Sequence, residues 1–196
     1  MTILCPGQGA QAVGMGKAWA SAHPESRAIF DRADEVLGDA LGTPLSTLCF
    51  EGPAERLNKT DAAQPAIFVT SVASWHGVCA IAGHDPAEAP LAAAAGLSLG
   101  EYTALHIAGA LSFEDGLKLV ALRGRAMQEA AEAAPSGMVA LIGADESSAT
   151  DLCEKVVGKL ADEPDRDRVL VPANFNAPGQ VVISGSAKAC DLAEQL

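Results

Sequence analysis

The fold is decided by the stretch Gly96-Leu97-Ser98-Leu99-Gly100-Glu101-Tyr102, a Gly-x-Ser-x-Gly turn placed where a run of small residues meets a helical pattern. A serine in such a sharp strand-to-helix turn projects its hydroxyl outward. Glycines two positions away on either side let the flanking backbones pass closely. The pattern therefore predicts a nucleophilic Ser98 and acyl-transfer chemistry. The alternative is a serine that only caps the following helix.

The residues on both sides of this turn predict an α/β protein rich in helix. Short apolar strands are expected at Thr2 to Pro6 and at Pro90 to Ala95, and the second suits a central parallel strand. Periodic apolar positions predict helices at about Val13 to Ser21, from Pro24, at Ala62 to Ala82, from Leu99 to about Gly109, and from Ser112 to Ala134. The helix at Ala62 to Ala82 carries few charges, so we expect it to be buried.

The residues after Pro135 follow a different pattern. They predict a strand at Met138 to Ile142, a helix at Ser147 to Leu160, strands at Val169 to Ala173 and Gln180 to Ser184, and the start of a helix at Ala187. This β-α-β-β-α order is a ferredoxin-like unit without its last strand. We therefore expect a core at residues 1–134 and an incomplete subdomain at 135–196. An incomplete sheet would expose a strand edge and apolar surface and lower the solubility.

Composition and charge narrow the function classes. The 196 residues carry a formal net charge of -12, which repels nucleic acid and anionic membrane surfaces and favours a small-molecule or protein partner. The five cysteines show no C-x-x-C pair, so they indicate reduced thiols in a cytoplasmic protein and no metal site. The N-terminus predicts no secretory leader, and no apolar stretch is expected to cross a membrane.

Four segments carry a family resemblance: Cys5 to Gln11, Gly96 to Leu105, Leu122 to Gln128, and Asn174 to Gly185. In this order they resemble malonyl-CoA:acyl carrier protein transacylases. The resemblance implies an α/β-hydrolase-like core with a parallel sheet and an inserted ferredoxin-like subdomain, both incomplete in this chain. It also implies malonyl transfer from malonyl-CoA to the phosphopantetheine thiol of acyl carrier protein, in fatty acid or polyketide biosynthesis, without a cofactor.

The candidate site residues follow from these segments. Ser98 would form a malonyl-serine intermediate. The backbone N–H of Leu99, the first in its helix, is placed to stabilise the oxyanion, and the resemblance assigns the second donor to the backbone N–H of Gln8. Arg123 is the candidate for the malonyl carboxylate, because a guanidinium pairs with a carboxylate bidentately. The alternatives are an ordinary turn at Gln8 and a surface ion pair for Arg123.

The chain departs from the family pattern in places. Leu97 stands where the family has histidine before the serine, and Cys5 and Ala10 replace phenylalanine and serine. The downstream Ser-x-Pro-x-His-type segment with the catalytic histidine is absent, so we expect a C-terminally truncated chain with little activity of its own. Two other hypotheses remain: a serine hydrolase or thioesterase on a related core, and a non-catalytic protein that binds acyl-CoA or carrier protein.

Overall fold

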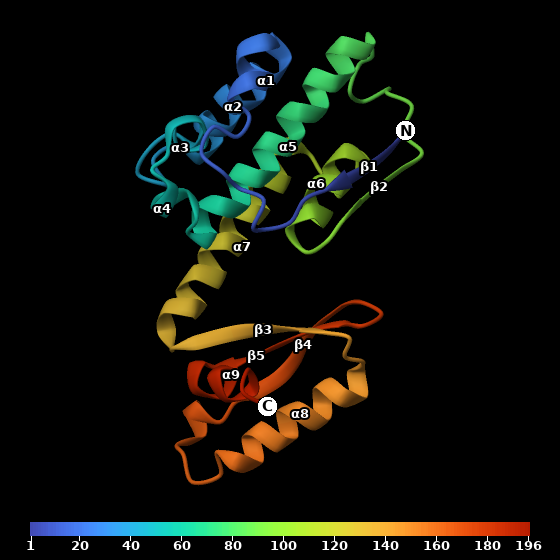
Figure 1. The fold of residues 1–196 in the computed structure, drawn as a ribbon. Helices are drawn as coiled ribbons and strands as arrows, with labels where there is room; N and C mark the ends of the chain where they lie inside the picture. Colours follow the sequence, from blue (N-terminus) through green and yellow to red (C-terminus); the bar gives the residue numbers. More distant parts are fainter. The chain divides into compact units, whose positions relative to one another are not determined.

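A computed structural model describes all residues 1–196, and the chain divides between Glu129 and Ala130 into two units (Figure 1). The expected boundary after residue 134 stays a prediction. The first unit holds β1 (Thr2–Cys5), α1 (Lys17–Ala22), α2 (Pro24–Leu37), α3 (Leu45–Glu51), α4 (Ala54–Leu57), α5 (Thr60–Ala82), β2 (Ala93–Gly96), α6 (Leu99–Ile107) and most of α7 (Phe113–Ala133).

The first unit is built around α5, which confirms the prediction of a buried helix. Thirteen of its residues are buried, and α2, α3 and α6 pack against it. By length and composition alone α5 could cross a membrane, but 56% of its most apolar window is buried inside this unit, as in the core helix of a globular protein. Beside it, β1 and β2 form a two-stranded parallel sheet in which Cys5 is paired with Gly96.

Two helix starts show how local signals act in this unit. Ser112 caps α7 as expected, because its Oγ accepts a hydrogen bond from the Asp115 N–H at 3.1 Å. The first helix was expected from Val13, but α1 begins only at Lys17. Gly14 and Gly16 adopt φ angles of 95° and 76°, outside the helical region, and a Cβ on Gly16 would lie 2.4 Å from the Phe30 ring. Packing against Phe30 therefore sets this start.

The second unit confirms the expected β-α-β-β-α order. It contains β3 (Ser136–Ile142), α8 (Glu146–Lys159), the 3-10 turn η1 (Asp165–Asp167), β4 (Leu170–Ala177), β5 (Gln180–Ser186) and α9 (Ala187–Ala193). The strands form an antiparallel sheet in the order β3-β5-β4, so β3 and β4 are both edges. Helices α8 and α9 pack on one face of this sheet, where Val181 and Ile183 are buried. The α/β prediction is confirmed, with one parallel and one antiparallel sheet.

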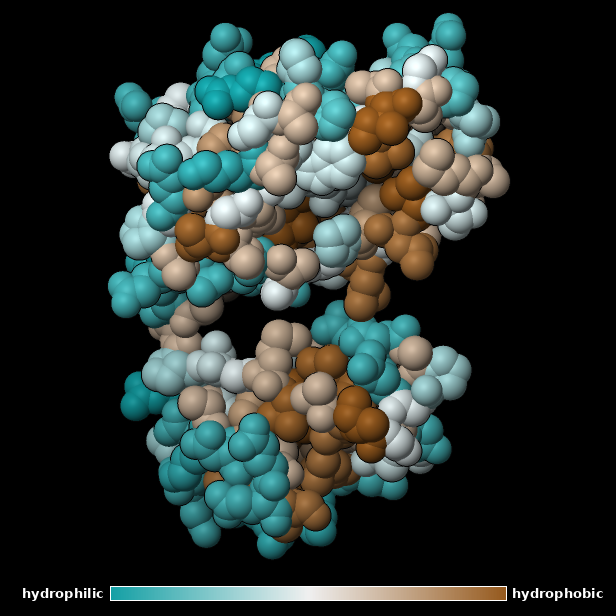
Figure 2. Space-filling model, turned by 45° about the horizontal axis from the view of Figure 1, so that its top comes forward, coloured by the Kyte–Doolittle hydropathy of each residue, from teal (hydrophilic) through white to brown (hydrophobic).

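The other face of the second unit's sheet is apolar and exposed, as expected. Figure 2 shows hydrophobic side chains gathered on this unit. Met138 and Ile142 of β3 are 60% and 77% exposed, and Val171 of β4, which like Met138 is paired with Ser184, is 52% exposed. An apolar sheet face of this kind is ordinarily covered by another surface. The expected low solubility stays a prediction.

Candidate active site

Ser98 occupies a strained backbone position between β2 and α6. Its φ of 55° and ψ of -112° make it the only non-glycine residue in the chain with a positive φ. An L-residue avoids this region because its Cβ crowds the adjacent carbonyl, so such a residue costs on the order of 1–3 kcal/mol. The Ser98 side chain does not cap α6 through a hydrogen bond. The conformation instead leaves the hydroxyl exposed at the start of the helix.

Two glycines make this turn possible. A Cβ on Gly96 would lie 2.1 Å from the carbonyl carbon of Gly100, and a Cβ on Gly100 would lie 2.3 Å from the carbonyl oxygen of Cys5. Both distances are far below van der Waals contact, so no other residue type fits. The second contact also brings the end of β1 against the start of α6. The loop that follows β1, with Gln8, therefore lies beside the turn, and Gly7 approaches the Leu97 carbonyl oxygen.

The backbone N–H groups of Leu99 and Gln8 are the predicted oxyanion donors, and that role stays a prediction. Leu99 is the first residue of α6 and is fully buried. The first N–H groups of a helix lack intrahelical partners and face the positive end of the helix dipole. Gln8 is exposed, and its side chain hydrogen-bonds to Thr60 Oγ1 at 3.1 Å. Leu97 is exposed, with 59% of its surface accessible to solvent.

Arg123 is the side chain that contacts Ser98 directly. Its Nη2 donates a hydrogen bond to Ser98 Oγ at 2.8 Å, although the two residues are 25 positions apart. Its Cζ lies 5.8 Å from the centroid of the Tyr102 ring, which is on the same helix as the turn. Arg123 is half buried and forms no ion pair with a carboxylate of this chain. The guanidinium is therefore held next to the hydroxyl and keeps N–H groups for an incoming anion.

Gln64 is a site residue that sequence reasoning missed. It is fully buried on α5, and its Oε1 accepts a hydrogen bond from Arg123 Nη1 at 2.7 Å. Its Nε2 donates to Met127 Sδ at 3.2 Å. A buried amide needs partners for both its oxygen and its nitrogen, and an apolar helix supplies none. A lone glutamine inside the apolar Ala62 to Ala82 pattern was the signal that could have indicated a distant polar partner.

The histidines and cysteines lie outside this arrangement. His106 Nδ1 is 3.0 Å from the Leu111 carbonyl oxygen, and its ring is within 6 Å of Phe68 and Phe113. Burial raises the pKa of the Cys5 thiol, and burial above all raises that of Cys49 to about 12, so neither is a thiolate at neutral pH. No group of three or more acidic, histidine or cysteine side chains is placed to hold a metal ion.

Comparison with known sequences identifies relatives of this chain. Residues 2–193 match the acyl transferase domain family. Malonyl CoA-acyl carrier protein transacylase of Salmonella typhimurium is 43% identical over 191 residues, which cover 97% of this chain and 56% of that protein. The enzyme of the same name from Bacillus subtilis is 41% identical over 196 residues, covering 100% of this chain and 56% of its own length. The chain thus spans little more than half of these curated relatives.

Solved structures agree with the sequence matches. An acyl carrier protein S-malonyltransferase from Vibrio cholerae superposes with a TM-score of 0.78 at 40% identity, over 98% of this chain and 57% of that one. A malonyl-transacylase solved in complex with its type II polyketide synthase acyl carrier protein gives a TM-score of 0.80 at 38% identity, over 99% and 57%. With the fold and nearly the whole sequence in agreement, the chain belongs to the acyl transferase domain family.

Proposed function

We propose that this chain supplies the nucleophile, the oxyanion donors and the carboxylate anchor for transfer of a malonyl group from malonyl-CoA to the phosphopantetheine thiol of acyl carrier protein. The observation that carries the proposal is the 2.8 Å hydrogen bond from Arg123 to the Ser98 hydroxyl on a strained turn. A guanidinium beside a nucleophile suits an acyl group that itself carries a carboxylate. The relatives named as malonyl transacylases support the same substrate.

The proposed reaction has two half-reactions. Ser98 Oγ attacks the thioester carbonyl of malonyl-CoA, and the N–H groups of Leu99 and Gln8 stabilise the oxyanion. The C–S bond then breaks, and CoA leaves as a thiol with the proton that Ser98 gave up. In the second half-reaction the carrier thiol attacks the malonyl ester, and the serine hydroxyl is restored. Arg123 binds the malonyl carboxylate throughout, which distinguishes malonyl from acetyl groups.

When Ser98 attacks, its hydroxyl proton must pass to a general base, and Arg123 cannot be that base. A guanidinium only donates hydrogen bonds and stays protonated in proteins. Arg123 is the partner that the Ser98 hydroxyl has in this chain. In the proposed mechanism Arg123 therefore orients the hydroxyl and anchors the acyl group, while the general base is a separate group.

The reaction class fits the remaining properties of the chain. Acyl transfer through a serine ester requires no cofactor, and all five cysteines are free thiols, which suits a cytoplasmic protein. Carrier proteins are acidic, and this chain has a net charge of -12, so docking must use local cations. Arg125 lies 3.8 Å from Glu129, which leaves Lys118, besides Arg123, as a cation on α7 without an ion pair. We assign the pathway to fatty acid or polyketide biosynthesis.

Intact-mass analysis after incubation with malonyl-CoA tests the proposal. The wild-type protein should gain one malonyl group, and Ser98→Ala should gain none. Adding phosphopantetheinylated carrier protein should then remove the group from the enzyme and load it on the carrier. Arg125→Ala is the control, because Arg125 is an exposed residue on α7, the helix that carries Arg123.

Three results would overturn the proposal. A malonyl adduct that survives Ser98→Ala would place the nucleophile elsewhere. Release of free malonate without a thiol acceptor would indicate a serine hydrolase or thioesterase. Binding of acyl-CoA or carrier protein with no adduct would indicate a non-catalytic role.

A further inference from the structure

The N-terminal end of α5 contacts both parts of the proposed site. Thr60 and Gln64 are four residues apart and lie on one face of the helix. The Thr60 hydroxyl accepts a hydrogen bond from Gln8 Nε2 at 3.1 Å, and Gln64 Oε1 accepts one from Arg123 Nη1 at 2.7 Å. One helix face therefore holds the loop with a proposed oxyanion donor and also holds the proposed carboxylate anchor.

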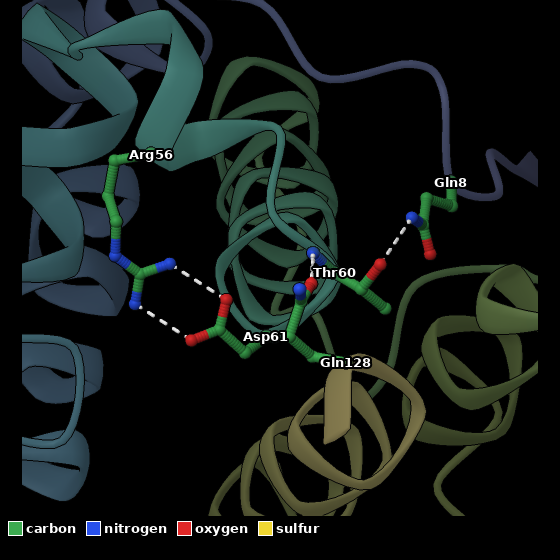
Figure 3. A network of polar contacts seen from close by, with 5 residues as sticks. All are labelled: Gln8, Arg56, Thr60, Asp61 and Gln128. Carbon is green, nitrogen blue, oxygen red and sulfur yellow. Dashed lines mark hydrogen bonds and ion pairs between the residues drawn. The ribbon is translucent and has the colours of Figure 1, made fainter. Parts of the chain in front are cut away.

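Thr60 is itself fixed from several directions (Figure 3). Its backbone N–H donates to Gln128 Oε1 of α7 at 3.0 Å. A Cβ on Gly124 would lie 2.7 Å from the Thr60 carbonyl oxygen, so α7 packs tightly against this point. The next residue, Asp61, accepts two hydrogen bonds from Arg56, at 2.8 and 2.9 Å. The Thr60 hydroxyl is thus a rigid attachment point for Gln8.

A second pair of contacts holds the same loop. Gln11 Oε1 accepts a hydrogen bond from the Gly9 N–H at 2.8 Å, and Gln11 Nε2 donates to Asn58 Oδ1 at 3.1 Å. Residues 58–60 therefore hold the loop at two points, through the side-chain amides of Gln8 and Gln11. Without these contacts the loop would have few constraints, because Gln8 is exposed and lies between two glycines.

We propose that Thr60 is a positioning residue for acyl transfer, whose hydroxyl holds the Gln8 side chain so that the Gln8 backbone N–H faces the acyl carbonyl oxygen. The inference rests on the proposed function, which makes that N–H an oxyanion donor. Such a donor stabilises the transition state only from a fixed position, and a displacement of about 1 Å can cost on the order of 100-fold in rate. Thr60 acts through Gln8 and touches no substrate atom.

The test compares Thr60→Val, which keeps the shape and removes the hydroxyl, with Thr60→Ser, which restores it. Rates of acyl-enzyme formation are measured with malonyl-CoA and acetyl-CoA, using the full-length protein. A neutral fluorophosphonate provides a second readout: Ser98 Oγ forms a bond to phosphorus, the P–F bond breaks, fluoride leaves and the hydroxyl proton passes to water. Thr150→Val on α8 is the control, because the Thr150 hydroxyl bonds only to the Glu146 carbonyl of its own helix.

Thr60→Val should lower kcat roughly 10- to 100-fold for both acyl groups and slow fluorophosphonate labelling by a similar factor. The KM for malonyl-CoA should change less than about twofold, because the Arg123 contacts are kept. Thr60→Ser should restore most of the rate, and Thr150→Val should match wild type. A loss confined to malonyl, an unchanged labelling rate, or no rescue by serine would overturn the inference.

A double-mutant cycle keeps the inference testable if Thr60→Val lowers the amount of folded protein. Gln8→Met removes the amide that bonds to Thr60. The double variant should therefore lose no more activity than either single variant, because both substitutions remove the same hydrogen bond. Additive losses would overturn the role of Thr60. If wild-type protein forms no malonyl adduct but is labelled at Ser98, the proposed substrate fails while the labelling rates still test Thr60.

Discussion

The serine turn of the first unit and the β4–β5 hairpin of the second both reverse the chain through a residue with positive φ, but they use different residue types. Each needs a residue with positive φ at a sharp reversal. The hairpin places Gly179 there, with a φ of 79° after Pro178, as a type II turn requires. The turn at Ser98 places a serine there with a φ of 55°. The hairpin is therefore unstrained, whereas the first unit tolerates strain at Ser98, the proposed nucleophile.

The two regions also differ in what holds them. Ser98 is bonded to Arg123, which is bonded to Gln64, and these contacts span 25 and 59 residues of sequence. The second unit relies on local contacts such as the capping box, in which Asp145 and Ser148 bond to each other's backbone at the start of α8. The proposed site thus depends on side chains brought together from distant parts of the sequence, while the start of α8 is specified by neighbouring residues.

The largest expected effect comes from the same substitution in a helix of each unit. Gly100→Ala in α6 should destabilise the first unit by more than about 3 kcal/mol, because its Cβ would strike the Cys5 carbonyl oxygen. Gly158→Ala in α8 meets open space and should stabilise the second unit by about 0.5 kcal/mol. Urea denaturation followed by far-UV circular dichroism compares the two. Equal effects would contradict the difference in packing.

The next effect concerns the acyl group. Arg123→Ala should reduce malonyl transfer roughly 100-fold and acetyl transfer much less, because charge-assisted hydrogen bonds contribute about 1.5–3 kcal/mol. Steady-state rates with malonyl-CoA and acetyl-CoA measure the difference, and Arg168→Ala in the second unit is the control. An equal loss for both acyl groups would remove Arg123 from the role of carboxylate anchor.

A smaller effect tests the strain directly. Ser98→Gly and Ser98→Ala both lose the Arg123 hydrogen bond, but only glycine relaxes the positive φ. Ser98→Gly should therefore be more stable than Ser98→Ala by about 1 kcal/mol. Gly179→Ala should destabilise the second unit by about 1 kcal/mol, because alanine would have to adopt the positive φ of Gly179. Thermal unfolding of the four proteins, wild type included, decides whether strain is confined to the serine turn.

The smallest effect is a difference in acid sensitivity between the units. Burial, and then the neighbouring His106, lower the pKa of His76 below 6.5. The folded first unit binds fewer protons than the unfolded chain, so its stability falls as the pH drops below 6.5 and levels off below the folded-state pKa. In the second unit, hydrogen bonds from Ser148 lower the pKa of Asp145 below 3.8. That stabilisation is complete above pH 3.8 and is lost only in stronger acid.

Two optical probes separate the units in this experiment. Trp19 and Trp75 both lie in the first unit, so tryptophan fluorescence follows it, while far-UV circular dichroism follows both. Between pH 7.5 and 5.5 the fluorescence midpoint in urea should fall slightly, and His76→Gln should reduce that fall. A fall that is unchanged in His76→Gln would assign the acid sensitivity to other groups.

Most elements could be predicted because their signals are local. Periodic apolar residues indicated α2, α5, α7 and α8, and the order of elements after residue 135 indicated the antiparallel unit. The exact start of β2 could not be predicted. Alanines have poor strand propensity, and Ala93–Gly96 is a strand because it pairs in register with β1. The short helices α3 and α4 also carried no periodic signal long enough to predict them.

The sequence by itself determined the serine turn. Gly96 and Gly100 are spaced around Ser98 so that only one kind of turn fits, and this pattern is recognised within five consecutive residues. Only the tertiary structure decided which distant side chains form the proposed site. Gln64, Thr60 and Arg123 come together because α5 and α7 pack closely at Gly124, and buried polar groups must find partners wherever the fold brings them. The spacing of residues in the sequence does not indicate which residues tens of positions apart are in contact.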